Sequence, residues 1–124
     1  MTPLKPQRAE IWEFDLGESR GREQAGLRPC LVVSTDAMNR SAFATVIVCP
    51  ITTRRRASFP WRPGLEPDDL EVVADDWQAK PNWVETDQVR TLDVEARALR
   101  HLGTLVNTDK LAAVDGSLRM MLSL

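Results

Sequence analysis

The chain has 124 residues, of which 43% are hydrophobic, and its formal net charge is −2. Its length and apolar content predict one globular domain over residues 1–124, and the longest apolar run, near residues 44–49, is far shorter than the roughly 20 residues of a membrane-spanning helix. Because the net charge is negative, the surface as a whole does not attract nucleic acid, and any such binding must be local.

The first residues predict a cytoplasmic protein that begins with a strand. Residues 1–8 contain prolines and charges but not the apolar segment of a secretory signal. In residues 10–16 every second residue is apolar, which is the period-two pattern of a half-buried strand. A charged loop with two glycines occupies residues 17–27, and the apolar run 29–34 predicts a more fully buried strand.

The strongest strand prediction covers residues 44–51, after a turn or single helical turn over residues 36–41. Proline inside a strand removes a hydrogen-bond donor, so Pro50 predicts a sheet edge or a bulge at that point. Residues 52–57 are predicted to form an exposed basic loop. Several prolines in the next stretch allow only short strand fragments between residues 60 and 67.

Two further strands are predicted over residues 70–74 and 83–89, with a polar loop over residues 75–81 between them. At least five strands are therefore expected. A brief helical pattern with Ala96, Leu99 and Leu102 is expected to end near Gly103, and residues 105–106 could add a short strand.

The clearest helix closes the chain, where Asn107 or Thr108 can cap the first unpaired amides. Its apolar stripe should pack on the sheet and consists of Leu111, Val114, Leu118, Met121 and Leu122. Many strands followed by one helix predict an α+β, mainly β fold, an antiparallel barrel rather than βαβ units. The chain also lacks the glycine-rich strand-to-helix motifs of nucleotide-binding folds.

Basic residues cluster in two loops, with Arg20, Arg22 and Arg28 in the first and residues 54–56 in the second. This distribution permits a positive groove on an acidic protein. The alternative is that short charge runs simply keep loops solvated, and for residues 54–56 alone that explanation is equally good.

Metal or thiol chemistry is not indicated. Cys30 and Cys49 lie in apolar runs, where free cysteine commonly behaves as a small buried hydrophobe. Two thiols and the single histidine, His101, cannot supply the four ligands of a structural zinc site, and a disulfide is unusual in a reducing cytoplasm. A catalytic Cys/His pair stays open in principle, although neither cysteine has a recognisable local signature.

An opening signature and five later blocks resemble the MazF/PemK family of toxins, and together they cover nearly the whole chain. The opening signature and the later blocks are Glu10-Ile11-Trp12 with Glu23-Gln24-Ala25-Gly26-Leu27-Arg28-Pro29, then Asn39-Arg40, Val46-Ile47-Val48-Cys49-Pro50-Ile51-Thr52, Asp87-Gln88-Val89-Arg90-Thr91, Leu102-Gly103-Thr104-Leu105 and the helix over residues 111–122. The chain departs from the pattern at Arg8-Ala9, where the family has Arg-Gly, and over residues 60–83.

The resemblance implies an SH3-like barrel with a C-terminal helix, forming a twofold homodimer whose interface builds an RNA channel. It further implies a sequence-specific endoribonuclease toxin that cleaves single-stranded mRNA without metal or cofactor and is neutralised by a cognate antitoxin. A disordered antitoxin segment with acidic groups is expected to occupy the channel. The alternatives are a non-nucleolytic, CcdB-like toxin and a degenerate toxin that only binds antitoxin.

By the same resemblance, Arg28 and Thr52 match the family's catalytic arginine and threonine. Cleavage by the 2′-hydroxyl of RNA needs a proton acceptor, stabilisation of charge on the phosphate and protonation of the leaving oxygen. A guanidinium can stabilise the negative charge on the phosphate, and a threonine hydroxyl can donate a hydrogen bond to a phosphate oxygen. Glu23 and Asp87 are the candidate bases. Family branches that use the Asp87 position carry an arginine where this chain has Glu85.

RNA contacts are expected from seven side chains, which are Arg22, Gln24, Asn39, Arg54, Arg55, Gln88 and Arg90. Each prediction has a structural alternative. Arg28 could only pin its loop, Thr52 could only cap a strand end, and Arg90 could only pair with Asp93. The amides of Gln24, Asn39 and Gln88 could equally be buried structural groups, and His101 is expected to lie away from the site.

Overall fold

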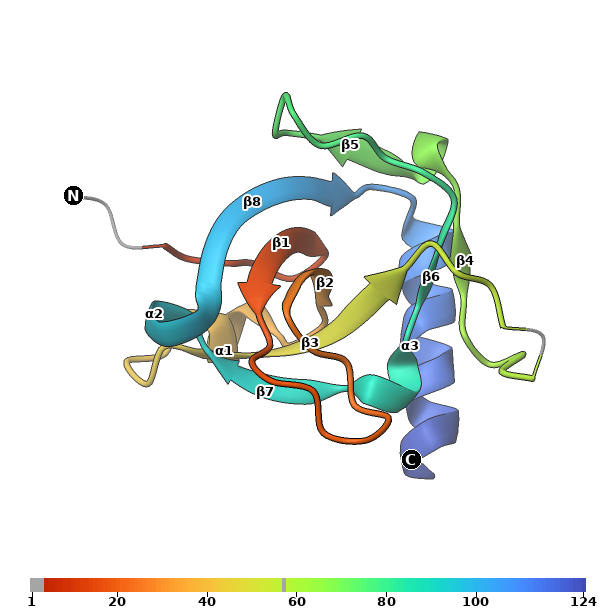
Figure 1. The fold of residues 1–124 in the computed structure, drawn as a ribbon, viewed down its shortest axis with the longest axis horizontal. Helices are drawn as coiled ribbons and strands as arrows, with labels where there is room; N and C mark the ends of the chain where they lie inside the picture. The colour runs from red at the N-terminus through yellow and green to blue at the C-terminus, as the bar shows by residue number, and fades with distance from the viewer. Residues whose placement is uncertain (1–3, 57) are drawn as a thin grey trace.

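The computed structural model describes residues 4–56 and 58–124 of the chain (Figure 1). Residues 1–3 of the N-terminal segment and Ala57 of the predicted basic loop lie outside the described residues. Within these ranges, eight strands form one antiparallel sheet in the order β4-β6-β3-β2-β1-β8-β5, with β7 pairing beside β3. The strands are β1 (Glu10–Asp15), β2 (Leu27–Val32), β3 (Thr45–Thr52), β4 (Gly64–Leu65), β5 (Leu70–Val72), β6 (Asn82–Val84), β7 (Arg90–Asp93) and β8 (Ala98–Leu105).

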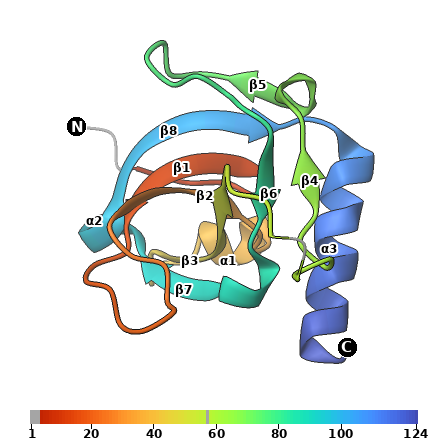
Figure 2. The same ribbon diagram turned by 45° about the vertical axis from the view of Figure 1, so that its right-hand side comes forward.

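The sheet is strongly curved, as Figure 2 shows, and helix α3 (Thr108–Leu122) runs along one side of it. Curvature lets the sheet bury apolar side chains on both faces. In β2, Leu31 belongs to the cluster that packs against α3, whereas Cys30 and Val32 belong to the cluster on the other face. This two-sided burial explains why β2 and β3 are almost continuously apolar, and the predicted antiparallel, mainly β architecture is confirmed.

The C-terminal helix follows its sequence prediction closely. The Asn107 side chain accepts hydrogen bonds from the backbone amides of Asp109 and Lys110, at 3.0 and 3.2 Å. Val114 is fully buried, and Leu111 and Leu118 pack against the same apolar cluster. The last turn differs, because Leu122 is exposed in the described chain.

The helical pattern predicted around Ala96 to Gly103 is wrong. Only one turn is helical, α2 (Val94–Arg97), and the chain then forms β8, which pairs with both β1 and β5. A strand held on both sides gains two rows of backbone hydrogen bonds, which outweigh the local apolar spacing. Gly103 is the point where β5 crosses closely, since a Cβ there would lie 2.9 Å from the Glu71 carbonyl oxygen.

Three smaller expectations also need correction. The strand predicted over residues 83–89 is only β6, and a 3₁₀ turn, η2 (Thr86–Gln88), follows it. The strand predicted over residues 70–74 is shorter, ending at Val72 in β5. Pro50 lies in an inner strand rather than at an edge. It sits where β3 changes its neighbour from β7, paired through Val48, to β6, paired from Ile51.

The turn predicted over residues 36–41 is the short helix α1 (Asp36–Asn39), capped by the Thr35 hydroxyl. A second 3₁₀ turn, η1 (Pro67–Asp69), precedes β5. Within the described ranges, no helix is both long enough and apolar enough to cross a membrane.

We predict that Phe14→Ala lowers the free energy of unfolding by about 3–5 kcal/mol, because Phe14 is fully buried in the apolar cluster opposite α3. Phe43→Ala removes the same side chain from a position that is 85% exposed, and it should change stability by less than about 0.5 kcal/mol. Urea denaturation at one protein concentration measures both. Equal losses in the two variants would contradict the described core.

Candidate active site

Arg28 and Thr52 face one pocket at the end of the β2–β3 pair. Cys30 pairs with Pro50 in this antiparallel register, and continuing the register places Arg28 opposite Thr52. The two side chains line a cavity of about 290 Å³. Its other lining residues are Gln24, Thr53, Arg54, Arg56, Arg62 and Glu85.

This pocket is strongly positive for a chain of net charge −2. Four arginines and one carboxylate line it. Arg28 donates its Nε hydrogen to the Ala25 carbonyl at 3.1 Å, so it does pin the loop, yet its two terminal nitrogens have no hydrogen-bond partner among the described residues. Thr52 Oγ1 accepts from the Arg54 amide at 3.2 Å and keeps its own proton to donate. Both side chains can therefore hold a structural contact and still offer donors to an anion.

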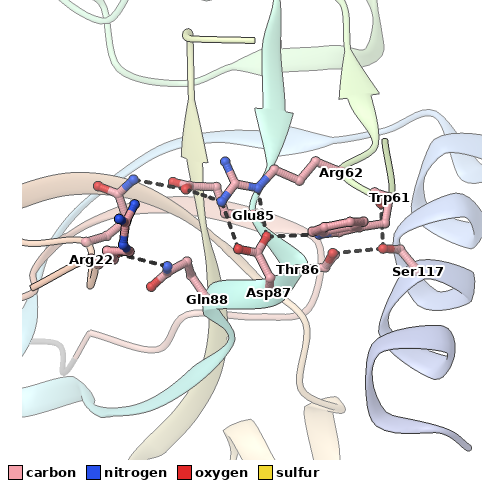
Figure 3. A network of polar contacts seen from close by, with 9 residues as sticks. Arg22, Trp61, Arg62, Glu85, Thr86, Asp87, Gln88 and Ser117 are labelled. Carbon is pink, nitrogen blue, oxygen red and sulfur yellow. Dashed lines mark hydrogen bonds and ion pairs between the residues drawn. The ribbon is translucent and has the colours of Figure 1, made fainter. Parts of the chain in front are cut away.

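A buried arginine, Arg62, also lines the pocket, and Figure 3 shows its contacts with Glu85 and Asp87. Its Nε and Nη2 donate to the two carboxylate oxygens of Asp87 at 2.7 and 2.8 Å, and Nη2 also lies 3.2 Å from Glu85 Oε2. The side chains of Arg62 and Glu85 are only 6% and 2% exposed. Burial of charge at this level is tolerated only when the charges pair.

The two carboxyl groups respond in opposite directions. Hydrogen bonds from Arg62 hold the pKa of Asp87 below its usual value. Burial raises the pKa of Glu85, although a 2.9 Å hydrogen bond from Gln24 and the charge of Arg62 partly oppose this rise. Asp87 thus has both oxygens engaged by Arg62 and a lowered pKa, and both features weaken it as a proton acceptor.

The polar network continues from this cluster to helix α3 (Figure 3). Trp61 Nε1 donates to Asp87 at 3.3 Å, and the Trp61 carbonyl accepts from the Ser117 hydroxyl at 2.7 Å. Ser117 also shares a 2.8 Å hydrogen bond with Thr86. The C-terminal helix is therefore tied directly to the turn that carries the site's carboxylates.

Two further hollows extend from the pocket and share Gln24 with it. One, of about 500 Å³, is lined by the predicted residues Arg22, Glu23, Gln88 and Arg90, and the other, of about 290 Å³, lies against the charged β1–β2 loop. Glu23 is exposed and lines these two hollows rather than the pocket of Arg28 and Thr52.

Several of the predicted contact residues have identifiable structural partners. The Gln88 amide donates to the Arg22 carbonyl at 3.2 Å and so closes the β1–β2 loop onto η2. Arg90 Nη1 donates to the Leu16 carbonyl at 3.4 Å, whereas Asp93 caps α2 instead of pairing with Arg90.

Asn39 does not belong to this groove. It is buried in α1, where its amide nitrogen donates to the Ser34 carbonyl and to Asp36, each at 3.1 Å. A side chain with this role holds the turn before β3 and has no group left for RNA, so its predicted contact is not retained.

The sequence-based site prediction did not select four residues of the pocket, which are Thr53, Arg56, Arg62 and Glu85. Arg56 lines it in place of Arg55, which lines a separate hollow of about 210 Å³ with Phe59 and Trp83. Arg62 lies in the stretch that departs from the family pattern, and its partners come from a distant segment. Glu85 had one indication in the sequence, because the family resemblance implies an arginine at this position in some branches.

Thiol chemistry at the cysteines is excluded by their surroundings. Burial raises the pKa of both Cys30 and Cys49 to about 12, so neither forms a thiolate near neutral pH. Their side chains belong to apolar clusters on opposite faces of the sheet, and both are free thiols.

His101 stacks on Trp12 at 5.2 Å, outside the hollows described above. Across residues 4–56 and 58–124, no cluster of three potential metal ligands occurs.

Residues 7–122 match the profile of a family described as the PemK-like, MazF-like toxin of type II toxin-antitoxin systems. The chain belongs to this family. The toxin is 31% identical over 122 residues to endoribonuclease MazF9 of Mycobacterium tuberculosis, a match that covers 95% of this chain and 97% of the relative. The family prediction made from the sequence blocks is thereby confirmed.

Solved structures give the toxin's fold independently. A crystal structure of MazF from Deinococcus radiodurans is similar with a TM-score of 0.72 and 26% identity, covering 98% of this chain and 99% of that one. A MazE–MazF crystal structure from the same organism has a TM-score of 0.74 and 25% identity, with 98% and 99% coverage.

We predict that Arg62→Ala lowers the free energy of unfolding by about 3–5 kcal/mol, because it leaves two carboxylates without their shared partner in a buried site. Arg40→Ala is the control. Arg40 lies 4.0 Å from Asp36 with 67% of its side chain exposed, and its removal should cost less than about 1 kcal/mol. Chemical denaturation that finds no difference between the two variants would show that Arg62 does not anchor the site.

The lowered pKa of Asp87 predicts that the free energy of unfolding depends on pH. Because its pKa is lower in the folded state than the unfolded value of about 3.8, its stabilising effect is present above that value and is lost as the pH falls through the folded pKa. The difference in unfolding free energy between the natural protein and Asp87→Asn should therefore shrink between pH 6 and about pH 3. Urea denaturation across that range tests it, and a difference that grows with acidity would refute the assignment.

Proposed function

We propose that this toxin is a metal-independent, sequence-specific endoribonuclease that cleaves single-stranded mRNA through the substrate's own 2′-hydroxyl. The observation that carries the proposal is the convergence of Arg28 and Thr52 on one arginine-lined pocket. Membership of the toxin family and similarity to an endoribonuclease support the reaction class. The 2′-hydroxyl is the group that distinguishes RNA from DNA at such a site.

In the proposed mechanism, the terminal nitrogens of Arg28 hold the non-bridging oxygens of the scissile phosphate. A guanidinium donates two parallel hydrogen bonds and remains charged at neutral pH, so it stabilises the extra negative charge of the transition state. Thr52 donates its hydroxyl to the same phosphate. Arg54 and Arg56, at the pocket rim, attract and orient the polyanionic strand.

The strand is proposed to continue from the pocket into the hollows that share Gln24. Arg22, Gln88 and Arg90 line this path with donors for phosphates or base edges. Arg55 lies on the other side, in the hollow with Phe59 and Trp83, where an unpaired base can stack on an aromatic ring. Sequence preference would then arise from contacts on both sides of the cleaved bond.

We further infer that the toxin acts in the cytoplasm as a twofold homodimer and is inhibited by a cognate antitoxin. Acidic antitoxin groups would occupy the arginines of the pocket and exclude RNA. Exposed apolar side chains are available for protein contacts both beside the pocket, at Leu27, and at the end of α3, at Met120 and Leu124.

Incubating the purified protein with a long RNA in EDTA tests the proposed activity. We expect cleavage by the natural protein, a loss of about 10²–10³ in rate for Arg28→Ala and a smaller loss for Thr52→Ala. Thr52→Ser keeps the hydroxyl and should restore most of the rate, and Arg40→Ala should cleave normally because Arg40 lies in none of the hollows described. Intact RNA with the natural protein would favour a non-nucleolytic toxin.

A further inference from the structure

Four carboxyl groups border the proposed RNA path, and they differ in what they can do. Both oxygens of Asp87 accept hydrogen bonds from Arg62. Glu18 and Glu23 are exposed and line the neighbouring hollows instead of the pocket. Among the described residues, Glu85 is the one carboxylate that lines the same pocket as Arg28 and Thr52.

The backbone fixes Glu85 beside the scissile position. Glu85 follows β6, and its amide donates to the Pro50 carbonyl at 2.8 Å, two residues before Thr52 on β3. The contacts from Gln24 and Arg62 both go to Oε2. Oε1 has no hydrogen-bond partner among the described residues, and Glu85 lines the pocket of Arg28 and Thr52 although its side chain is only 2% exposed. Oε1 is therefore the oxygen available to a substrate.

We propose that Glu85 accepts the proton of the attacking 2′-hydroxyl. This assignment rests on the proposed nuclease function and adds the proton acceptor that the reaction requires. A carboxylate suits this task when it is held within hydrogen-bonding reach of the hydroxyl by rigid elements, and Glu85 is held at one end by β3 and at the other by Gln24 and Arg62.

Burial and the charges around Glu85 act on its pKa in opposite directions. Four groups face it from the packed elements: Gln24 from the β1–β2 loop, Arg28 from β2, Arg62 from the loop before β4, and Asp87 from η2. Burial raises the pKa of Glu85 and so strengthens the ionised group as a proton acceptor, while the two arginines and Gln24 favour the ionised form.

The Glu85 carboxylate takes the 2′ proton as the 2′ oxygen forms its bond to phosphorus, and the bond between phosphorus and the 5′ oxygen breaks. The leaving 5′ oxygen takes a proton from water, which gives a 2′,3′-cyclic phosphate and a 5′-hydroxyl. Protonated Glu85 then returns its proton to solvent.

The competing role for Glu85 is purely positional, because the same side chain also holds Gln24 and Arg62. Two readouts separate the roles. Loss of a positioning residue weakens RNA binding. This binding can be measured without cleavage by using an RNA with one 2′-deoxy nucleotide at the mapped cleavage site. A proton acceptor instead governs the acid side of the pH profile and stays necessary when the leaving group is a 5′-bridging sulfur, which needs no proton to depart.

The experiment is single-turnover cleavage of an RNA oligonucleotide spanning the mapped site, from pH 4.5 to 8, with Glu85→Gln and Glu85→Asp. For Glu85→Gln we expect a rate loss of about 10²–10⁴ and no acid limb, an equal defect on the sulfur substrate, and 2′-deoxy RNA binding within about threefold of the natural protein. Glu85→Asp should retain the acid limb at a reduced rate, which shows that loss of folding is not the cause. Thermal denaturation of each variant accompanies the rates.

Other results overturn the inference. Cleavage by Glu85→Gln within about threefold of the natural rate, with an unchanged acid limb, removes Glu85 as the base but leaves the nuclease function intact. Weakened 2′-deoxy RNA binding that accounts for the whole defect assigns Glu85 a positioning role. Recovery on the sulfur substrate would make it the proton donor. If the natural protein cleaves no RNA, the proposed function and this inference fail together.

Discussion

The site depends on one buried guanidinium. Arg62 contacts Asp87 and Glu85 simultaneously, and without it two carboxylates would stand uncompensated behind the pocket. Their charge would oppose a phosphate and their burial would destabilise the fold. With Arg62 in place, the charges of Arg28, Arg54 and Arg56 remain in excess at the pocket. An acidic chain thereby presents a local positive surface.

The sheet supplies the geometry around this cluster. At Pro50, β3 exchanges β7 for β6 as its neighbour, so the turn bearing Glu85 and Asp87 arrives beside Thr52. The β2–β3 register sets Arg28 opposite that threonine. Helix α3 secures the same turn through the hydrogen bond between Ser117 and Thr86. Fold stability and site geometry are therefore coupled through a few polar contacts.

The parts predictable from sequence are those governed by local pattern. The strands near residues 10–16 and 44–51 and the terminal helix follow from apolar periodicity and capping, whereas Arg28 and Thr52 are selected by resemblance to the family. What failed depends on distant partners. Residues 98–105 form a strand because β1 and β5 flank them, and Arg62 meets carboxylates more than twenty residues away. Neither contact leaves a local signature.

The proposed reaction requires this pocket to direct a 2′-hydroxyl onto the neighbouring phosphate. Mass spectrometry of fragments cut in EDTA tests this requirement, using one RNA and its counterpart with a single 2′-deoxy nucleotide at the cleavage site. We expect 2′,3′-cyclic phosphate and 5′-hydroxyl ends from the first RNA and no cut at that position in the second. Fragments with 5′-phosphate ends, or cleavage of the 2′-deoxy strand at the same bond, would contradict it.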